Sequence, residues 1–216
     1  MNQEGILILF AHFEKEFDRD KWQNYISLLP DEERKRIDRH TRWQGRMARL
    51  IGRLLLLYGL KILLGEKNPH LSIIYNDRGK PSLAGNIDFN ISHSGEYVIC
   101  ALSQGGKVGI DIEKIRDVEW EKFSRWIPPS QWIALHNSPN PKEDFFSLWS
   151  INEAVLKGDG RGLTAISELQ VAEDGKSALL NGGEWFIEEI PLAEGYRCHL
   201  ACNSPNVPHT IKELSY

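Results

Sequence analysis

The chain has 216 residues, enough for one large domain or for two small lobes with a hydrophobic core. Its composition, 41% hydrophobic and 26% charged, is typical of soluble globular proteins. The net charge of −4 gives no support to a nucleic-acid partner, and the longest apolar run, Leu54–Leu57, is too short to span a membrane.

The three cysteines, Cys100, Cys198 and Cys202, lack the paired spacing of a zinc site. Two of them lie in apolar, strand-like runs, so buried free thiols are expected. No signal peptide is evident at the N-terminus, and we therefore expect a protein of the reducing cytoplasm.

The first half of the chain is expected to pair a long helix with a small sheet. Pro30 stops an early helix, and the turn Asn76–Pro81 separates two later strands. The expected strands are 5–12, 70–75, 89–92 and 97–102, and the expected helices are 20–29 and 31–57, the second ended by Tyr58-Gly59.

The second half has a similar order of elements. A strand over 108–113 opens it, and Gly158-Asp159-Gly160 ends its longest helix. The expected helices are 117–126, 130–136 and 142–157, the expected strands are 168–172, 178–180, 184–190 and 197–203, and the last ten residues are expected to form a loosely held tail.

A weak internal repeat relates the two halves, because the helix-ending Gly59-Leu60 corresponds to Gly162-Leu163 about 100 residues later. Each half would be one long helix packed on a small, mainly antiparallel sheet. We therefore expect an α/β (α+β) fold of two similar lobes related by a pseudo-two-fold, residues 1–106 and 107–216, with ligands bound in the cleft between them.

The strand over 108–113 carries the most informative residues. Side chains alternate along a strand, so Asp111 and Glu113 leave on the same face. Two adjacent carboxylates repel each other, and a magnesium-type cation with oxygen ligands would relieve that repulsion. The simpler interpretation is an edge strand with two solvated acids.

The helix over 142–157 adds a third carboxylate. Trp149, Glu153 and Lys157 share one helix face at i, i+4 spacing. A core tryptophan and a surface Glu–Lys pair would explain them equally well in an isolated helix. The glycine-rich loop 158–162 favours a ligand site, because so flexible a segment allows a close approach after the lysine.

Two further segments offer groups to a phosphate. Ser92 and His93 supply a hydroxyl and an imidazole at the end of a strand, and Lys80 supplies an ammonium in a Gly-Lys-Pro turn. The basic residues crowded over 34–53 are mostly explained as a solvated helix face, with one or two of them contacting an anionic ligand.

In this order and spacing, the four segments resemble the 4′-phosphopantetheinyl transferases of the surfactin-activating (Sfp) type. That family shows a Gly-Lys-Pro turn, Asn-Ile-Ser-His-Ser, Gly-Ile-Asp-Ile-Glu and Trp-Ser-x-Lys-Glu-(Ala/Ser)-x-x-Lys. The matching segments are Gly79–Pro81, Asn90–Ser94, Gly109–Glu113 and Trp149–Lys157, followed by Gly160–Leu163. Each motif alone is weak, but the ordered set is specific and covers about residues 30 to 163.

The resemblance implies a monomer of two similar α/β lobes with a defined reaction. The serine hydroxyl of an apo acyl or peptidyl carrier protein would attack the β-phosphate of coenzyme A. The phosphopantetheine arm would be transferred, and adenosine 3′,5′-bisphosphate released. No nucleic acid or membrane takes part in such a reaction.

The resemblance also assigns the metal and the catalytic residues. Asp111, Glu113 and Glu153 would hold Mg²⁺, with Mn²⁺ as an alternative, and Lys157 would contact the pyrophosphate. The serine needs a proton acceptor, for which Glu153 and a metal-bound water held by Glu113 both remain candidates.

The coenzyme contacts implied by the resemblance come from both halves of the chain. His93 would lie near the 3′-phosphate, and Arg49 is preferred over Arg46 as the arginine contact of the N-terminal helical region. The full set of coenzyme-binding residues is then Lys35, Arg49, Lys80, Ser92, His93 and Lys157.

One position departs from the family pattern, because Asn152 stands where the family usually has lysine. Asparagine carries no charge, so we hypothesise an active enzyme with altered turnover. The acidic carrier protein is expected to dock near the segment after Glu113, which contains Arg116, Trp120, Phe123 and Trp126.

Two other functions compete with this interpretation. Acids and a lysine also build metal-dependent nucleases, but Lys114 directly follows Glu113 and therefore points to the other strand face. The second alternative is a non-catalytic module that binds coenzyme A or a carrier, motivated by Asn152. Retention of all three carboxylates argues against it.

Overall fold

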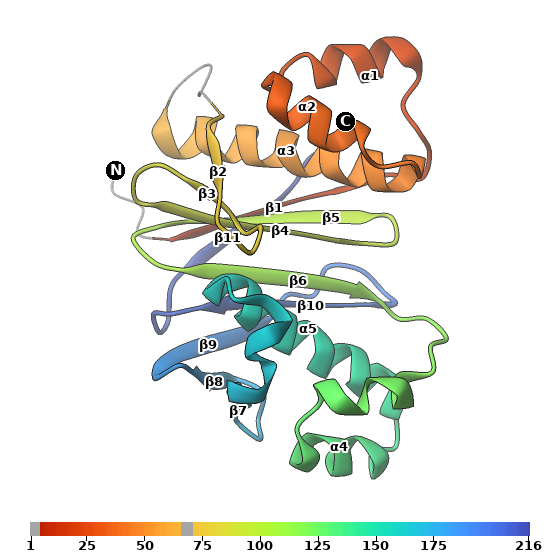
Figure 1. Ribbon diagram of the computed structural model, residues 1–216, viewed down its shortest axis with the longest axis vertical. Coiled ribbons are helices and arrows are strands. Elements are labelled where there is room, and N and C mark those ends of the chain that lie inside the picture. The colour runs from red at the N-terminus through yellow and green to blue at the C-terminus, as the bar shows by residue number, and fades with distance from the viewer. Residues whose placement is uncertain (1–4, 66–70) are drawn as a thin grey trace.

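The computed structural model describes residues 5–65 and 71–216. Helices pack on two separate sheets, with α1–α3 on the first and α5 on the second (Figure 1). None of the helices in these ranges is sufficiently long and apolar to traverse a lipid bilayer. The helices are α1 (Arg19–Ile26), α2 (Asp31–Asp38), α3 (Trp43–Leu64), α4 (Pro129–His136) and α5 (Pro141–Asp159), with the 3-10 helices η1 (Trp120–Trp126) and η2 (Gly162–Glu168).

The strands form two mainly antiparallel sheets and a small hairpin. The first sheet has the order β11-β1-β5-β4, the second has the order β6-β10-β9-β8-β7, and β2 pairs with β3. The strands are β1 (Ile6–His12), β2 (Ile73–Tyr75), β3 (Pro81–Leu83), β4 (Ile87–Ser94), β5 (Tyr97–Gln104), β6 (Val108–Lys114), β7 (Gln170–Val171), β8 (Ser177–Leu180), β9 (Gly183–Glu189), β10 (Tyr196–Cys202) and β11 (His209–Glu213).

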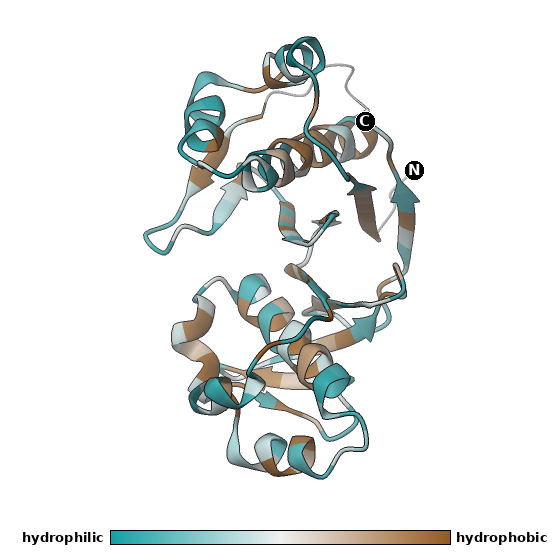
Figure 2. Ribbon diagram, turned by 90° about the vertical axis from the view of Figure 1, so that its right-hand side faces the viewer, coloured by the Kyte–Doolittle hydropathy of each residue, from teal (hydrophilic) through white to brown (hydrophobic). Residues whose placement is uncertain are grey.

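Apolar side chains divide the molecule into layers. One core lies between α1–α3 and the first sheet, a second lies between the two sheets, and a third lies between the second sheet and α5. In the side view, hydrophilic positions dominate the outer helices at the top, while hydrophobic positions recur along α3 beneath them (Figure 2). The predicted α/β class with antiparallel sheets is confirmed.

The strand pairing repeats in the two halves of the chain. β1 pairs with β5 over seven antiparallel residue pairs, from Ile6–Ser103 to His12–Tyr97. β6 pairs with β10 over seven as well. The division into lobes at residue 106 stays a prediction, and the part of the expected strand that contains His70 lies outside the described residues.

The single helix predicted over 31–57 is wrong. The structure has two helices, α2 and α3, separated by residues 39–42, and α3 continues to Leu64 before Gly65 ends it in the left-handed conformation. Gly59 lies inside α3, where an added Cβ would come within 2.6 Å of the Leu102 side chain of β5. This glycine therefore permits close helix–sheet packing and does not end the helix.

Two other expectations need correction. The last residues are not a loose tail, because β11 pairs in parallel with β1 and Tyr216 packs against the first core. Strand pairing with β1 thus ties the end of the chain to the first sheet. The segment predicted as a helix over 117–126 forms only the 3-10 helix η1.

A polar ladder joins the neighbouring edge strands β4 and β6, which belong to different sheets. Alternate side chains of β4 lie on one side, so each can accept a hydrogen bond from a backbone N–H of β6. The acceptor and donor pairs are Asp88–Val108 at 2.8 Å, Asn90–Ile110 at 3.1 Å, Ser92–Ile112 at 3.4 Å and Ser94–Lys114 at 3.1 Å.

The helix α5 approaches β6 unusually closely. A Cβ added to Gly109 would lie 1.9 Å from the carbonyl oxygen of Ala154 and 2.6 Å from the nitrogen of Gly158. Only glycine leaves room for the helix backbone at this point. The contact brings the C-terminal half of α5 directly over the carboxylates of β6.

We predict that Asn90→Ala lowers the free energy of unfolding by about 1–3 kcal/mol, because it leaves the buried N–H of Ile110 without its acceptor. Urea denaturation measures the change. The matched control is Asn24→Ala, on the exposed surface of α1, which should change the free energy of unfolding by less than about 0.5 kcal/mol. Equal effects of the two substitutions would contradict the role of the ladder.

Candidate active site between the two sheets

Asp111 is the centre of the site. It lies in the middle of β6, and its carboxylate is almost fully buried, with a side-chain exposure of 3%. Ser92 of β4 donates a hydrogen bond to Asp111 Oδ1 at 2.7 Å. Two residues further along β6, Glu113 Oε2 accepts a hydrogen bond from Ser94 at 2.9 Å. The ladder serines thus hold both carboxylates.

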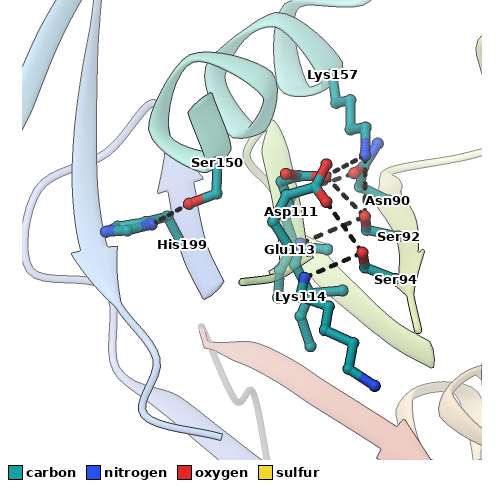
Figure 3. Close-up of polar contacts among 11 residues, drawn as sticks. Asn90, Ser92, Ser94, Asp111, Glu113, Lys114, Ser150, Lys157 and His199 are labelled. Carbon is teal, nitrogen blue, oxygen red and sulfur yellow. Dashed lines mark hydrogen bonds and ion pairs between the residues drawn. The ribbon is translucent and has the colours of Figure 1, made fainter. Parts of the chain in front are cut away.

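Helix α5 supplies the counter-charge. Lys157 Nζ lies 2.5 Å from Asp111 Oδ1 and 3.0 Å from Ser92 Oγ (Figure 3). Glu153 lies one turn before Lys157, and both its attraction to Lys157 and its repulsion by Asp111 act on its ionisation. The structure thus brings Lys157 to Asp111, while the joint role of Asp111, Glu113 and Glu153 stays a prediction.

Burial and mutual repulsion act on the ionisation of the carboxylates. Burial, and then repulsion by Asp111, raises the pKa of Glu113 to about 7. Burial also raises the pKa of Glu153, although Lys157 opposes the shift. Burial alone would lower the pKa of Lys157, but the hydrogen bond and charge of Asp111, together with the charges of Glu153 and Glu113, outweigh burial and raise the pKa. The lysine is therefore an ammonium held by the acids.

The site fits a cation chemically. In residues 5–65 and 71–216, no three His, Cys, Asp or Glu side chains are grouped closely enough to enclose a metal ion. Asp111 Oδ2, however, is buried without a hydrogen-bond partner in the same part of the chain, which is costly for a carboxylate. Hard divalent cations prefer such oxygen ligands, and here the ammonium of Lys157 supplies the positive charge.

A cationic cavity of about 350 Å³ adjoins the carboxylates. It lies between the N-terminal half of α3, the β2–β3 hairpin and the end of α5. Among residues 5–65 and 71–216, no acidic side chain lines it, so it is suited to an anion of several charges. Its cationic and polar lining residues include Arg49, Arg53, Arg78, Lys80, His93 and Lys157.

Lys80 also connects the two halves of the chain at this cavity. Its ammonium donates to the carbonyl oxygen of Gly158 at 2.7 Å and lies 3.8 Å from Asp88. A cation at the last carbonyls of a helix is favoured by the helix dipole. Its aliphatic part lies so close to Gly160 that an added Cβ would come within 2.7 Å of Lys80 Cδ.

His93 lies at the mouth of the cavity. Desolvation, and then the positive charge of Arg49, lowers the pKa of its ring to about 4. The imidazole is therefore neutral at neutral pH when no ligand is bound. A bound phosphate would favour the protonated form through its negative charge.

Not every predicted coenzyme contact lies at this cavity. Lys35 is on an exposed face of α2, where it pairs with Glu32 at 3.1 Å, and it does not line the cavity. Arg46 bonds to Glu16 at 2.7 Å, whereas Arg49 lines the cavity. The geometry thus favours Arg49 over Arg46, while the role of Lys35 stays a prediction.

Asn152 is buried, with an exposed fraction of 1%. Neither atom of its amide has a hydrogen-bond partner among the described residues. The side chain does not line the cationic cavity. The effect of Asn152 on turnover stays a prediction. Because Asn152 does not line the cationic cavity, such an effect would not come from contact with a ligand there.

A second cavity of about 710 Å³ meets the first at Ala48 and His93. His40, Arg42 and Arg116 line it. Arg116 is therefore the member of the predicted carrier-docking segment that faces an open site. Trp120 and Phe123 instead pack in an aromatic core with Phe145 and Trp149, and Trp126 packs against the core beneath α5.

Sequence reasoning missed a network that supports the cavity wall. Glu33 is buried at 4% exposure and accepts hydrogen bonds from Arg53 at 2.6 Å and from Tyr75 at 2.9 Å. It also missed the ladder role of Asp88 and Asn90. The period-two run of acceptors over residues 88–94 was a signal that could have revealed the ladder.

Comparisons with known proteins agree with this geometry. Residues 16–105 match the family model described as "4′-phosphopantetheinyl transferase, N-terminal", and residues 107–200 match the "4′-phosphopantetheinyl transferase superfamily". The chain is 30% identical to the 4′-phosphopantetheinyl transferase gsp of Aneurinibacillus migulanus, over 89% of this chain and 84% of that protein.

Two further relatives extend the comparison. The chain is 23% identical to the 4′-phosphopantetheinyl transferase Sfp of Bacillus subtilis, over 95% of this chain and 96% of that protein. It is 29% identical to the 4′-phosphopantetheinyl transferase HetI of Nostoc sp., over 69% and 67% of the two chains. The matches favour a transferase over a nuclease or a binding module. Together with the site, they show that this chain is an enzyme of the Sfp-type 4′-phosphopantetheinyl transferase family.

Proposed function

We propose that this enzyme transfers the 4′-phosphopantetheine arm of coenzyme A to a serine of an apo acyl or peptidyl carrier protein, with release of adenosine 3′,5′-bisphosphate. The observation that supports this most directly is the contact between an acid cluster and a cationic cavity. Lys157 belongs to both, because it bonds to Asp111 and lines the cavity. Phosphoryl-type transfer needs this combination of charge neutralisation and positioning.

The reaction is proposed to depend on Mg²⁺, with Mn²⁺ as an alternative. Asp111, Glu113 and Glu153 would hold the ion, and the orphaned Asp111 Oδ2 is the oxygen best prepared to bind it. When bound, the ion polarises the phosphoryl group and stabilises the charge that develops on it.

The cationic cavity is proposed to hold the phosphates of the coenzyme. Arg49 and Lys80 offer a guanidinium and an ammonium, and His93 at the mouth would meet the 3′-phosphate. Lys157 and Ser92 lie next to Asp111 and would meet the pyrophosphate there. Lys35 remains a more distant candidate on α2.

The attacking serine needs a group that accepts its proton. Glu153, or a water that Glu113 would hold, could accept it at the acid cluster. A base is most effective when its pKa lies near the working pH, and both carboxylates have raised pKa values in the ligand-free protein. The two alternatives therefore stay open.

The carrier protein is proposed to approach through the second cavity. Arg42 and Arg116 present positive charge from opposite halves of the chain, and the cavity meets the coenzyme cavity at His93. Glu14 and Glu96 also line this cavity, so the attraction of an acidic carrier would rest on contacts with Arg42 and Arg116 themselves. The serine would then enter next to the pyrophosphate.

We further propose that the enzyme acts as a monomer in the cytoplasm. Its three cysteines are free and buried, as expected of a protein that folds in a reducing compartment. Burial raises the pKa of Cys100 and of Cys198, so neither thiol is reactive at neutral pH.

Incubation of an apo carrier protein with this enzyme, coenzyme A and Mg²⁺ is expected to add one phosphopantetheine, about 340 Da by mass spectrometry. Asp111→Asn should lower the rate by at least about 100-fold, because it removes the carboxylate that both the cation and Lys157 need. Asp38→Asn, on the exposed end of α2, is the control. Transfer that persists in EDTA would contradict the metal role, and coenzyme binding without transfer to any carrier would favour a binding module.

We expect Arg49→Met to raise the KM for coenzyme A by about tenfold, because it removes a charge-assisted contact from the cavity wall. Lys35→Met should change that KM by less than about twofold, because the exposed Lys35 does not line the cavity. Steady-state kinetics at fixed Mg²⁺ measures both values. An equal rise in the two variants would place Lys35 at the coenzyme after all.

Glu113→Gln is expected to stabilise the metal-free protein above pH 7. The folded-state pKa of Glu113 is raised to about 7 from an ordinary 4.5, so its contribution to stability is present below pH 4.5 and is lost as the pH rises through 7. In EDTA at pH 8 the variant should be more stable by about 1–3 kcal/mol. Thermal unfolding from pH 5 to 8 tests this, with the exposed Glu184→Gln as control. An unchanged pH dependence in Glu113→Gln would refute the repulsion.

A further inference from the structure

Helix α5 is tied to the second sheet by three polar contacts at seven-residue intervals. Glu143, Ser150 and Lys157 carry them, and residues seven apart lie on nearly the same helix face, two turns from each other. Their partners are Arg197, His199 and Asp111, at 2.6 Å, 2.6 Å and 2.5 Å.

The strand partners are also aligned. His199 of β10 lies directly opposite Asp111 of β6, and directly opposite residues of an antiparallel pair share a face. Figure 3 shows the Ser150–His199 contact and the Lys157–Asp111 contact at separate places along α5. The position of α5 on these two strands therefore sets where Glu153 and Lys157 stand relative to Asp111.

The three ties differ in their surroundings. The Glu143–Arg197 pair is exposed, with half of the Glu143 side chain in solvent, so it stabilises the helix position only weakly. The Lys157–Asp111 pair belongs to the reactive site itself. Ser150 and His199 are buried, at 0% and 4% exposure, so their contact is neither screened nor open to ligands.

Apolar packing also contributes to the helix position. Ile151, Ala154 and Val155 of α5 lie in the third core with Trp185 and Ala201 of the sheet. The Ser150–His199 contact adds a directional hydrogen bond to this packing. Burial, and then Arg197, lowers the pKa of His199 to about 4, so the ring is neutral in the working range. Ser150 Oγ also lies 3.0 Å from the carbonyl oxygen of Ser147, which connects the pair to the helix backbone.

We propose that His199 is a positioning residue, which through its hydrogen bond to Ser150 fixes α5 on β10 so that Glu153 and Lys157 stay aligned with Asp111. The consequence for catalysis rests on the proposed function. When a ligand draws Lys157 away from Asp111, the Ser150–His199 contact keeps the helix in place. Transition-state alignment, rather than coenzyme affinity, should depend on it.

The test compares His199→Leu, which removes the hydrogen bond, with His199→Asn, whose amide can occupy the place of Nδ1 and keep it. The first measurement is reductive methylation of Lys157 in the metal-free, coenzyme-free protein, by peptide mass spectrometry. The exposed Lys35 in the same sample is the internal reference. We expect His199→Leu to raise the Lys157 to Lys35 ratio several-fold and His199→Asn to retain the wild-type ratio.

The second measurement is steady-state transfer to an apo carrier protein. His199→Leu should lower kcat by about tenfold and change the KM for coenzyme A by less than about twofold. His199→Asn should restore most of kcat. If His199→Leu does not fold, Ser150→Ala removes the same contact from the helix side. The same changes in Lys157 methylation and in kcat are then expected of Ser150→Ala.

The outcomes separate the two proposals. Unchanged Lys157 methylation and unchanged kcat in the folded variants overturn the positioning role. A lower melting temperature with both readouts unchanged also overturns it, because the contact is then only structural. A wild-type enzyme that modifies no carrier overturns the proposed function, while the methylation ratio still tests the position of the helix.

Discussion

The polar ladder between β4 and β6 is the interaction on which the rest of the site depends. Two sheets meet there edge to edge without a shared backbone ladder, and the N–H groups of β6 are satisfied by side chains instead. Each unsatisfied buried N–H would cost about 1–3 kcal/mol, so the pairing enforces a single register. The same register places Ser92 on Asp111 and Ser94 on Glu113. Strand pairing and the arrangement of the acids are therefore one constraint.

Much of the fold could be predicted because periodicity and turn residues are local signals. The strands at Asp111 and Ser92 and the helix of Glu153 and Lys157 are where the sequence places them. The break between α2 and α3 was missed because Arg39–Arg42 contains neither glycine nor proline. Its origin is tertiary, as is the helical state of Gly59 under Leu102. A sequence pattern alone does not carry such packing information.

The site shows the same division between local and tertiary information. Motif spacing was sufficient to bring Asp111, Glu113 and Lys157 together, because each stands on a regular element. It could not place Lys35, because the direction in which that side chain points depends on how α2 packs on the rest of the protein. No sequence pattern indicated a role for His199. Its proposed role depends on the strand register, which places it opposite Asp111 and in contact with Ser150.

Lys157 connects the acid cluster to the coenzyme cavity through a competition. Its ammonium neutralises Asp111 in the ligand-free protein, where three desolvated carboxylates would otherwise repel each other. A divalent cation bound at Asp111 Oδ2 would repel that ammonium, and a second anion nearby would then favour its release from Oδ1. The pyrophosphate of the coenzyme would be such an anion, directly across the cavity that Lys157 lines. Under the proposed function, the same lysine would make the binding of cation and coenzyme favour each other, provided that α5 itself does not shift when the contact with Asp111 is lost.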